Sequence, residues 1–395
     1  MGKEFILKRI LDYAVDGDSI WLITTEFPNF FFKYNLHKKE FECMVKFPDS
    51  IRGDGVPFRY VRKVEREIYF FSEEINEIYI WGIDTGEFQT VNFGNEEDGL
   101  FKGKKIYPIE SEKYVYCISI MSLILVQIDK KSKECKLVDI SCGHSIAANR
   151  MTHMAYYSFF PCLYHKKVLI PIQDKIISYD EERGATEIFA DTGIQMRSLD
   201  DGFSDYLFGV VCCNDRLVVF TYCGEVFVKE ETGFRKVERD NQEEVILKGG
   251  YYRPVFIDVS VFDQESIFLV YDTHYAYRCK VDKGYVELVK HEFGEDVLIN
   301  GSTIKKRDND YCIITSWDIR DAFNFNVIDG HIEKFQIGFD LNRDDFYGIL
   351  HDAGMSGIIS ADCLEGLFGA VNYSAGIEEN SKTETVGARI YKNSL

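Results

Sequence analysis

Five residues have the side chains expected of a site that binds an anion. They are Arg150, His153, Arg197, Tyr252 and Arg253. An arginine guanidinium recognises a carboxylate or phosphate through two parallel charge-assisted hydrogen bonds, and a tyrosine ring can stack against a sugar. The set therefore predicts a site for a carboxylate, a phosphate or an acidic sugar. The alternative is that each arginine pairs with a carboxylate of a neighbouring structural repeat.

A second group of side chains has the chemistry of a metal site. Cys142, His144 and His153 offer one thiolate and two imidazoles, which are ligands that zinc accepts. No fourth ligand is evident and the spacing matches no common site, so we expect no metal and no cofactor. The sequence also contains no His-Glu-x-x-His, Gly-x-Ser-x-Gly, Gly-x-x-x-x-Gly-Lys or Cys-x-x-Cys motif. Whether the protein is an enzyme stays open, because a site can be assembled from single residues of several repeats.

A long repeat must position these residues. A β-rich run that ends in a charged turn recurs seven times, and its copies end at Asn35, Asp84, Asp129, Asp180, Lys229, Asp282 and Asp329. The steps between these anchors run from 45 to 53 residues, a length that accommodates about four short strands. The repeat predicts an all-β fold, a seven-bladed β-propeller, with six or eight blades as alternatives.

The repeat also predicts the limits of each blade. The blades are expected at residues 5–47, 58–94, 104–140, 154–190, 206–238, 252–291 and 302–337. In blade two the strands are expected at residues 59–64, 67–72, 77–83 and 88–93, with an Asp-Thr-Gly turn before the fourth. Residues 7–14 and 331–337 give the first blade its own inner strand and the last blade its own outer strand. Closure of the ring by strand exchange between the termini is therefore possible but not required.

The propeller topology explains why residues far apart in the sequence are expected to form one site. Each connection from an outer strand to the next inner strand opens onto the same face of the ring. The five candidate binding residues all lie in such connections, so we expect them to project into one channel mouth. We assign residues 1–340 to the propeller and residues 341–395 to a C-terminal extension, partly helical or irregular.

The repeats over residues 5–340 resemble those of bacterial β-propeller proteins of the broad kelch-like and WD-like kind. Trp317-Asp318 and Gly249-Gly250 each occur once, without the recurrence that marks WD or kelch repeats. The segment from Gly387 to Tyr391 is similar to the tail of some bacterial propellers found near surface-polysaccharide genes. The resemblance implies an architecture and no activity.

Composition narrows the range of partners and of cellular location. The net charge is 46 − 65 = −19, which argues against nucleic acid and against anionic membranes as partners. No apolar run is long enough to span a bilayer, and the N-terminus lacks the apolar stretch of a secretory signal. The 11 cysteines show no framework spacing, so we expect reduced thiols and a cytoplasmic protein.

These observations favour a non-enzymatic cytoplasmic propeller that binds a partner protein or small ligand on its loop face. The alternative is an enzyme or sensor that acts on an anionic carbohydrate in the central funnel. A pocket that combines the arginines, a carboxylate and Tyr252 would favour the alternative. The sequence does not indicate the oligomeric state.

Overall fold

The computed structural model describes the inner and outer strands of every repeat. The described residues are 4–6, 10–24, 30–48, 58–72, 76–94, 106–119, 122–143, 160–195, 205–238, 256–262, 265–270, 274–282, 286–294, 297, 303–315 and 321–340. Within them the only regular elements are β-strands, so the part of the chain that is described contains no helix able to cross a membrane.

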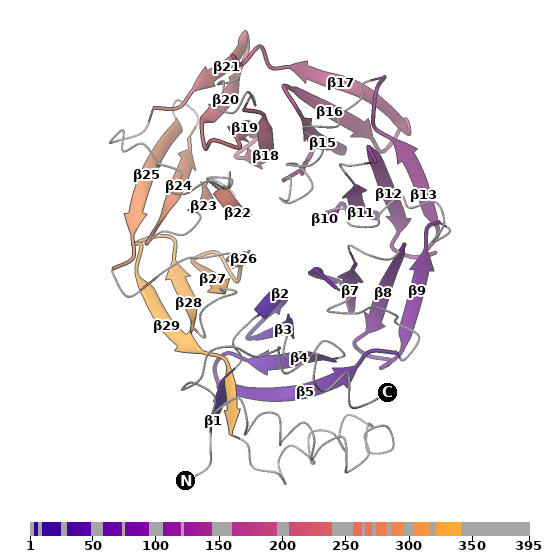
Figure 1. Cartoon of the computed structure of the whole chain (residues 1–395), viewed down its shortest axis with the longest axis vertical. Helices are drawn as coiled ribbons and strands as arrows, with labels where there is room; N and C mark the ends of the chain where they lie inside the picture. Colours follow the sequence, from indigo (N-terminus) through magenta and orange to yellow (C-terminus); the bar gives the residue numbers. More distant parts are fainter. Residues whose placement is uncertain are drawn as a thin grey trace, which may run out of the picture.

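Seven four-stranded antiparallel sheets form a closed ring around a central channel, as Figure 1 shows. Blade one contains β2 (Ile10–Asp16), β3 (Ser19–Thr24), β4 (Phe30–Asn35) and β5 (Glu40–Lys46), and blade two contains β6 (Tyr60–Val64), β7 (Glu67–Phe71), β8 (Glu77–Gly82) and β9 (Phe88–Asn92). Blade three contains β10 (Ile106–Glu110), β11 (Tyr114–Ser119), β12 (Ile124–Asp129) and β13 (Cys135–Asp139). Blade four contains β14 (Cys162–Tyr164), β15 (Lys167–Ile172), β16 (Lys175–Asp180) and β17 (Ala185–Asp191).

The other three blades repeat this order. Blade five contains β18 (Leu207–Cys213), β19 (Arg216–Thr221), β20 (Val226–Glu230) and β21 (Gly233–Lys236), and blade six contains β22 (Phe256–Val261), β23 (Glu265–Val270), β24 (Tyr275–Val281) and β25 (Val286–Glu292). Blade seven contains β26 (Thr303–Lys306), β27 (Tyr311–Thr315), β28 (Asp321–Asn326) and β29 (Ile332–Gln336). The prediction of an all-β propeller with seven blades is confirmed, and the alternatives of six or eight blades are wrong.

Burial along each blade follows from packing on both faces. The second strand β7 is buried at four successive residues, Ile68 to Phe71, because both of its faces meet a neighbouring blade. The outer strand β9 is more exposed and buries only Val91. The four strands of blade two lie within one residue of their predicted limits at each end. In blade seven the third strand ends at Asn326, so the predicted anchor Asp329 falls inside the following turn.

Apolar side chains form seams between the blades. In the seam between blades one and two, the ring of Phe31 lies 4.7 Å from that of Phe70 and 5.2 Å from that of Phe47. A corresponding seam joins blade seven to blade one, where the buried Tyr13 hydroxyl donates to the backbone carbonyl of Ile313. This last seam closes the ring, since it joins side chains about 300 positions apart in sequence.

The two ends of the propeller pair with each other outside the blades. β1 (Glu4–Ile6) and β30 (Gly338–Asp340) form a two-stranded antiparallel ribbon in which Glu4 is opposite Asp340. The ribbon lies beside β5, at the outer edge of blade one (Figure 1). Every blade keeps four consecutive strands, so no strand is exchanged between the first and last blades.

Candidate ligand site in the central channel

The connections between blades, all on one face of the ring, are longer than the turns within blades on the other face. The six connections from an outer strand to the next inner strand contain 10 to 22 residues, and the longest is 140–161, between β13 and β14. On the opposite face, every turn between first and second or third and fourth strands has two to five residues. We call these the connection face and the short-turn face. Loops of more than about 12 residues inside a compact domain usually carry function.

The five residues predicted from the sequence fall in three of these long connections. Arg150 and His153 belong to 140–161, Arg197 to 192–206, and Tyr252 and Arg253 to 237–255. All five lie outside the described residues, and their convergence stays a prediction. His144 and His153 of the suggested metal set also lie outside them. Among the residues that are described, no group of three or more His, Cys, Asp or Glu side chains is placed to hold a metal ion.

Within the described residues, the central channel contains a cavity of about 410 Å³. Its wall comes from the inner strands β2, β6, β10, β22 and β26, together with Pro161 beside β14. The volume is in the range of small-ligand sites. Five charged side chains line it: Arg62, Lys63, Lys305, Lys306 and Glu110. Four of the five are cations, in a protein whose net charge is −19.

Asp12 connects three blades at the wall of this channel. Its Oδ2 accepts a hydrogen bond from the Val61 backbone amide of blade two at 2.8 Å, and its Oδ1 lies 3.2 Å from Lys305 Nζ of blade seven. The Asp12 side chain is 2% exposed and that of Lys305 is 13% exposed. Burial and the nearby Arg62 guanidinium lower the pKa of Lys305, and the carboxylates of Asp12 and Asp258 offset this effect only in part.

Asp258 makes the equivalent contact between blades six and seven. Its Oδ2 accepts from the Ile304 backbone amide and its Oδ1 from the Val259 amide, both at 2.9 Å. Asp12 and Asp258 each follow an irregularity in the pairing of their inner strand with the second strand. A bulge of this kind re-aims the next side chain, here toward the adjacent blade. Burial raises the pKa of Asp258 to about 6, although Lys305 and the two amide hydrogen bonds act in the opposite direction.

Arg62 projects from β6 toward blade three. One guanidinium nitrogen donates to the Pro108 carbonyl at 3.4 Å, and the guanidinium carbon lies 5.6 Å from the centre of the Tyr107 ring. This arrangement is a cation–π contact. Arg62 makes no ion pair with any carboxylate in the described part of the chain, so its charge is balanced only at longer range.

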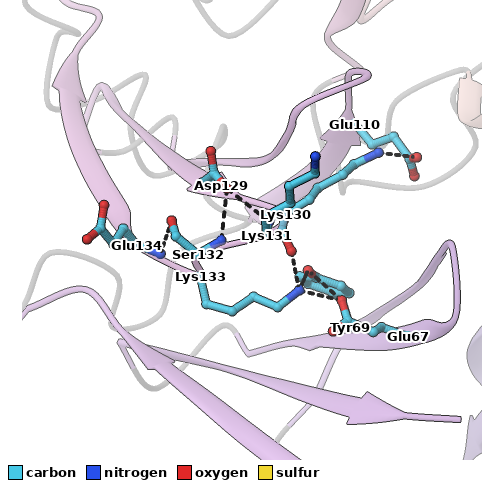
Figure 2. A network of polar contacts seen from close by, with 9 residues as sticks. All are labelled: Glu67, Tyr69, Glu110, Asp129, Lys130, Lys131, Ser132, Lys133 and Glu134. Atoms are coloured by element: carbon cyan, nitrogen blue, oxygen red, sulfur yellow. Dashed lines mark hydrogen bonds and ion pairs between the residues drawn. The ribbon is translucent and has the colours of Figure 1, made fainter. Parts of the chain in front are cut away.

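The other charged residues of the wall have partners nearby. Lys63 Nζ lies 3.1 Å from Asp16 Oδ1, and Lys306 Nζ lies 5.2 Å from the centre of the Phe262 ring. Glu110 accepts from Lys130 Nζ at 2.9 Å (Figure 2).

A polar network joins blade two to blade three. Figure 2 shows Lys133, in the turn after β12, reaching Glu67 and Tyr69 of β7. The Lys133 Nζ to Tyr69 Oη distance is 2.9 Å. Asp129 accepts from the backbone amides of Lys131 and Ser132 and so fixes the turn that carries Lys133. Asn35, Asp180 and Asn326 cap the corresponding turns in the same way, which explains why such residues end the repeated phrase.

Sequence reasoning missed the charged residues of the inner strands. A usable signal was present only at Asp12, which interrupts the apolar run from Ile10 to Val15, whereas Arg62 and Lys305 are each followed by another lysine. An ionic side chain at such a position must find a partner or line a hydrated cavity. The sequence could not show which of them meet.

Comparisons with known proteins support the fold alone. No protein-family model and no curated protein matches the sequence. Among solved structures, Hsv2 of Kluyvelomyces marxianus is 10% identical with a TM-score of 0.52, covering 84% of this chain and 99% of Hsv2. The WD40 repeats of RRP9 are 11% identical with a TM-score of 0.52, covering 78% of this chain and 88% of that one.

A bacterial protein shows the same level of likeness. PorZ of the Porphyromonas gingivalis type-IX secretion system is 10% identical with a TM-score of 0.53, covering 86% of this chain and 39% of PorZ. These similarities do not bear on the bacterial origin or the kelch-like kind suggested by the sequence. The chain is a seven-bladed β-propeller whose structural neighbours include WD40 propellers.

Proposed function

We propose that this protein is a non-enzymatic binding platform whose partner docks on the connection face. The observation that carries the proposal is the contrast between connections of 10–22 residues on that face and turns of two to five residues on the other. A rigid ring holds the strand ends from which these connections leave in fixed relative positions, and loops are where propellers and other scaffolds place recognition residues.

The described side chains support binding over catalysis. The two buried channel carboxylates, Asp12 and Asp258, are occupied by backbone amides of the next blade. Burial raises the pKa of the Cys43 thiol to about 11 and those of Cys213 and Cys279 to about 12. Thiols that stay protonated at neutral pH are poor nucleophiles.

A cytoplasmic location is part of the proposal. Ten cysteines lie in the described part of the chain, and each is a free thiol there. Scattered free thiols suit a reducing compartment, where disulfides are rare. Mass spectrometry of the native protein without reductant would test this point, and two or more native disulfides would contradict it.

The nature of the partner defines two versions of the proposal. The first is a partner protein. The second is a small anionic ligand, and it is favoured by the arginines in the three connections 140–161, 192–206 and 237–255. The alternative to both versions is an enzyme or sensor that acts on an anionic carbohydrate in the central funnel. In the second version Arg150, His153, Arg197, Tyr252 and Arg253 would contact the ligand.

Lysine-reactive cross-linking in cell lysate, followed by mass spectrometry, tests the docking face. Lys102, Lys104 and Lys248 lie in long connections, and Lys39, Lys131 and Lys166 lie in short turns. We expect partner cross-links at the first set. Cross-links confined to the second set would place the partner on the short-turn face and contradict the proposal.

Two double variants test whether the affinity depends on the connection arginines, as the second version requires. Arg197→Ala with Arg253→Ala should weaken an anionic ligand by roughly 1.5–3 kcal/mol for each charge-assisted hydrogen bond lost. The matched control is Arg183→Ala with Arg235→Ala, two arginines that are 58% and 48% exposed outside the connections. Binding that is equally impaired in both double variants would indicate a general charge effect.

A further inference from the structure

The guanidinium of Arg62 has hydrogen-bonding capacity that the described protein does not use. Arginine carries five N–H donors, and the described contacts of Arg62 are a 3.4 Å hydrogen bond to the Pro108 carbonyl and the contact with the Tyr107 side chain, through its ring and by a hydrogen bond. The residue lines the 410 Å³ cavity together with Lys305 and Lys306. A half-buried guanidinium on a cavity wall is placed to bind a carboxylate or phosphate through two parallel hydrogen bonds.

The charge balance around the cavity favours an anion. Lys305 pairs with Asp12, Lys63 with Asp16 and Glu110 with Lys130. The charged groups left without an ion-pair partner among the described residues are two cations, Arg62 and Lys306, and one carboxylate, Asp258. The cluster therefore carries one excess positive charge. Asp258 accepts hydrogen bonds from two backbone amides and is not among the residues that line the cavity.

The surroundings of Arg62 also suit the organic part of a ligand. Tyr107, Pro108 and Ile109 of blade three and Val259 of blade six contribute apolar surface to the same cavity. A ligand with a charged group at Arg62 could pack its carbon skeleton against these residues. The cavity is large enough for a molecule of the size of a monosaccharide derivative.

We infer that the central channel is a binding site for a small organic anion with a carboxylate or phosphate group, held by Arg62 and assisted by Lys305 and Lys306. This site is formed by the inner strands, with Pro161 as the one lining residue from a connection, and it does not depend on a partner at the connection face. The carboxylate and phosphate versions share one recognition chemistry, and they are distinguished by the probes of the experiment.

Isothermal titration calorimetry tests the site with three sugars of similar size. Glucuronate supplies a carboxylate, glucose 6-phosphate supplies a phosphate and glucose supplies neither. We expect the full-length protein to bind one or both anions and glucose at least tenfold more weakly. Arg62→Gln should weaken the anion about tenfold or more, as expected for loss of a charge-assisted hydrogen bond. Arg62→Lys should weaken it less, because the charge remains and the planar fork is lost.

The matched control is Arg66→Gln, which removes an exposed arginine of the same blade that pairs with Asp84 outside the channel. Its affinity for the anions should equal that of the unchanged protein. Thermal unfolding of each variant shows whether the ring is intact, and Arg62→Lys supplies the test if Arg62→Gln does not fold. Failure of the unchanged protein to bind either anion would overturn the inference, as would equal affinities in the Arg62 and Arg66 variants. Partner cross-links on the connection face would be unaffected by either result.

Discussion

The carboxylate of Asp12 accepts a hydrogen bond from the backbone amide of Val61 at 2.8 Å, across the boundary between blades one and two. The same carboxylate pairs with Lys305 of blade seven at 3.2 Å. The buried Asp12 side chain of blade one therefore contacts both neighbouring blades, two and seven. It lies at the junction where the first and last repeats meet, so ring closure should be sensitive to it.

Removal of Asp12 should destabilise the propeller strongly. Asp12→Ala leaves the Val61 amide without an acceptor and Lys305 as an uncompensated buried charge, a change that costs about 3–5 kcal/mol of unfolding free energy. Urea denaturation measures this loss. Asp18→Ala, in an exposed turn of the same blade, is the control and should change stability by less than about 0.5 kcal/mol.

The contribution of the ion pair itself can be separated by a double-mutant cycle. Lys305→Met replaces the ammonium by an apolar group of similar length, and the double variant with Asp12→Ala no longer contains an unpaired cation. We expect the double variant to be less destabilised than the sum of the two single variants. Additive effects would mean that the 3.2 Å pair contributes little.

Two exposed or partly exposed lysines occupy backbone positions that favour glycine. Lys39 and Lys133 have φ values of 57° and 61° in turns where Gly86, Gly184 and Gly330 hold the corresponding place. Lys39→Gly should stabilise the protein by roughly 0.5–1 kcal/mol, because glycine relieves the left-handed strain. Lys133→Gly should not, because it also removes the contacts to Glu67 and Tyr69 (Figure 2). Equal gains in chemical denaturation would show that this network contributes no stability.

Asp258 should make stability depend on pH in a predictable direction. Its pKa is about 6 in the folded protein against 3.8 for an ordinary aspartate, so the folded state binds the proton more tightly. The contribution of Asp258 to stability is therefore largest below pH 3.8 and falls as the pH rises to about 6, by roughly 3 kcal/mol in total. Asp258→Asn does not titrate, so the stability of the unchanged protein minus that of the variant should fall over this interval and stay constant above it. A difference independent of pH from 4 to 7 would contradict the raised pKa.

The ribbon of β1 and β30 provides a sharp boundary for truncation. A chain that ends at residue 340 retains β30 and should keep its melting temperature within a few degrees of the full-length value. A chain that ends at residue 337 loses β30 and leaves β1 without its partner, so it should melt at a lower temperature. Loss of folding already at residue 340 would mean that residues 341–395 belong to the propeller and are not an extension.

The sequence predicted seven blades, with six or eight as alternatives, and most of their strands. The period of the repeat reflects a local requirement, since each blade needs four short β-rich strands and a turn residue such as Asn35, Asp129 or Asp180 that caps its own backbone. These constraints act within a few neighbouring positions, so they can be read along the chain. The five residues assigned to the connection face follow from the same topology and remain a prediction.

How the repeats meet could not be read from the sequence, because the contacts between them are long-range. The contact of Asp12 with Lys305, the nearness of Arg62 to that pair and the pairing of β1 with β30 all join segments from opposite ends of the propeller. Strand alternation indicates which side chains of an inner strand share a face. The residue that each of them contacts on the next blade depends on ring closure and on the bulges that re-aim Asp12 and Asp258. These long-range geometries place Arg62 on a cavity wall without an ion-pair partner among the described residues.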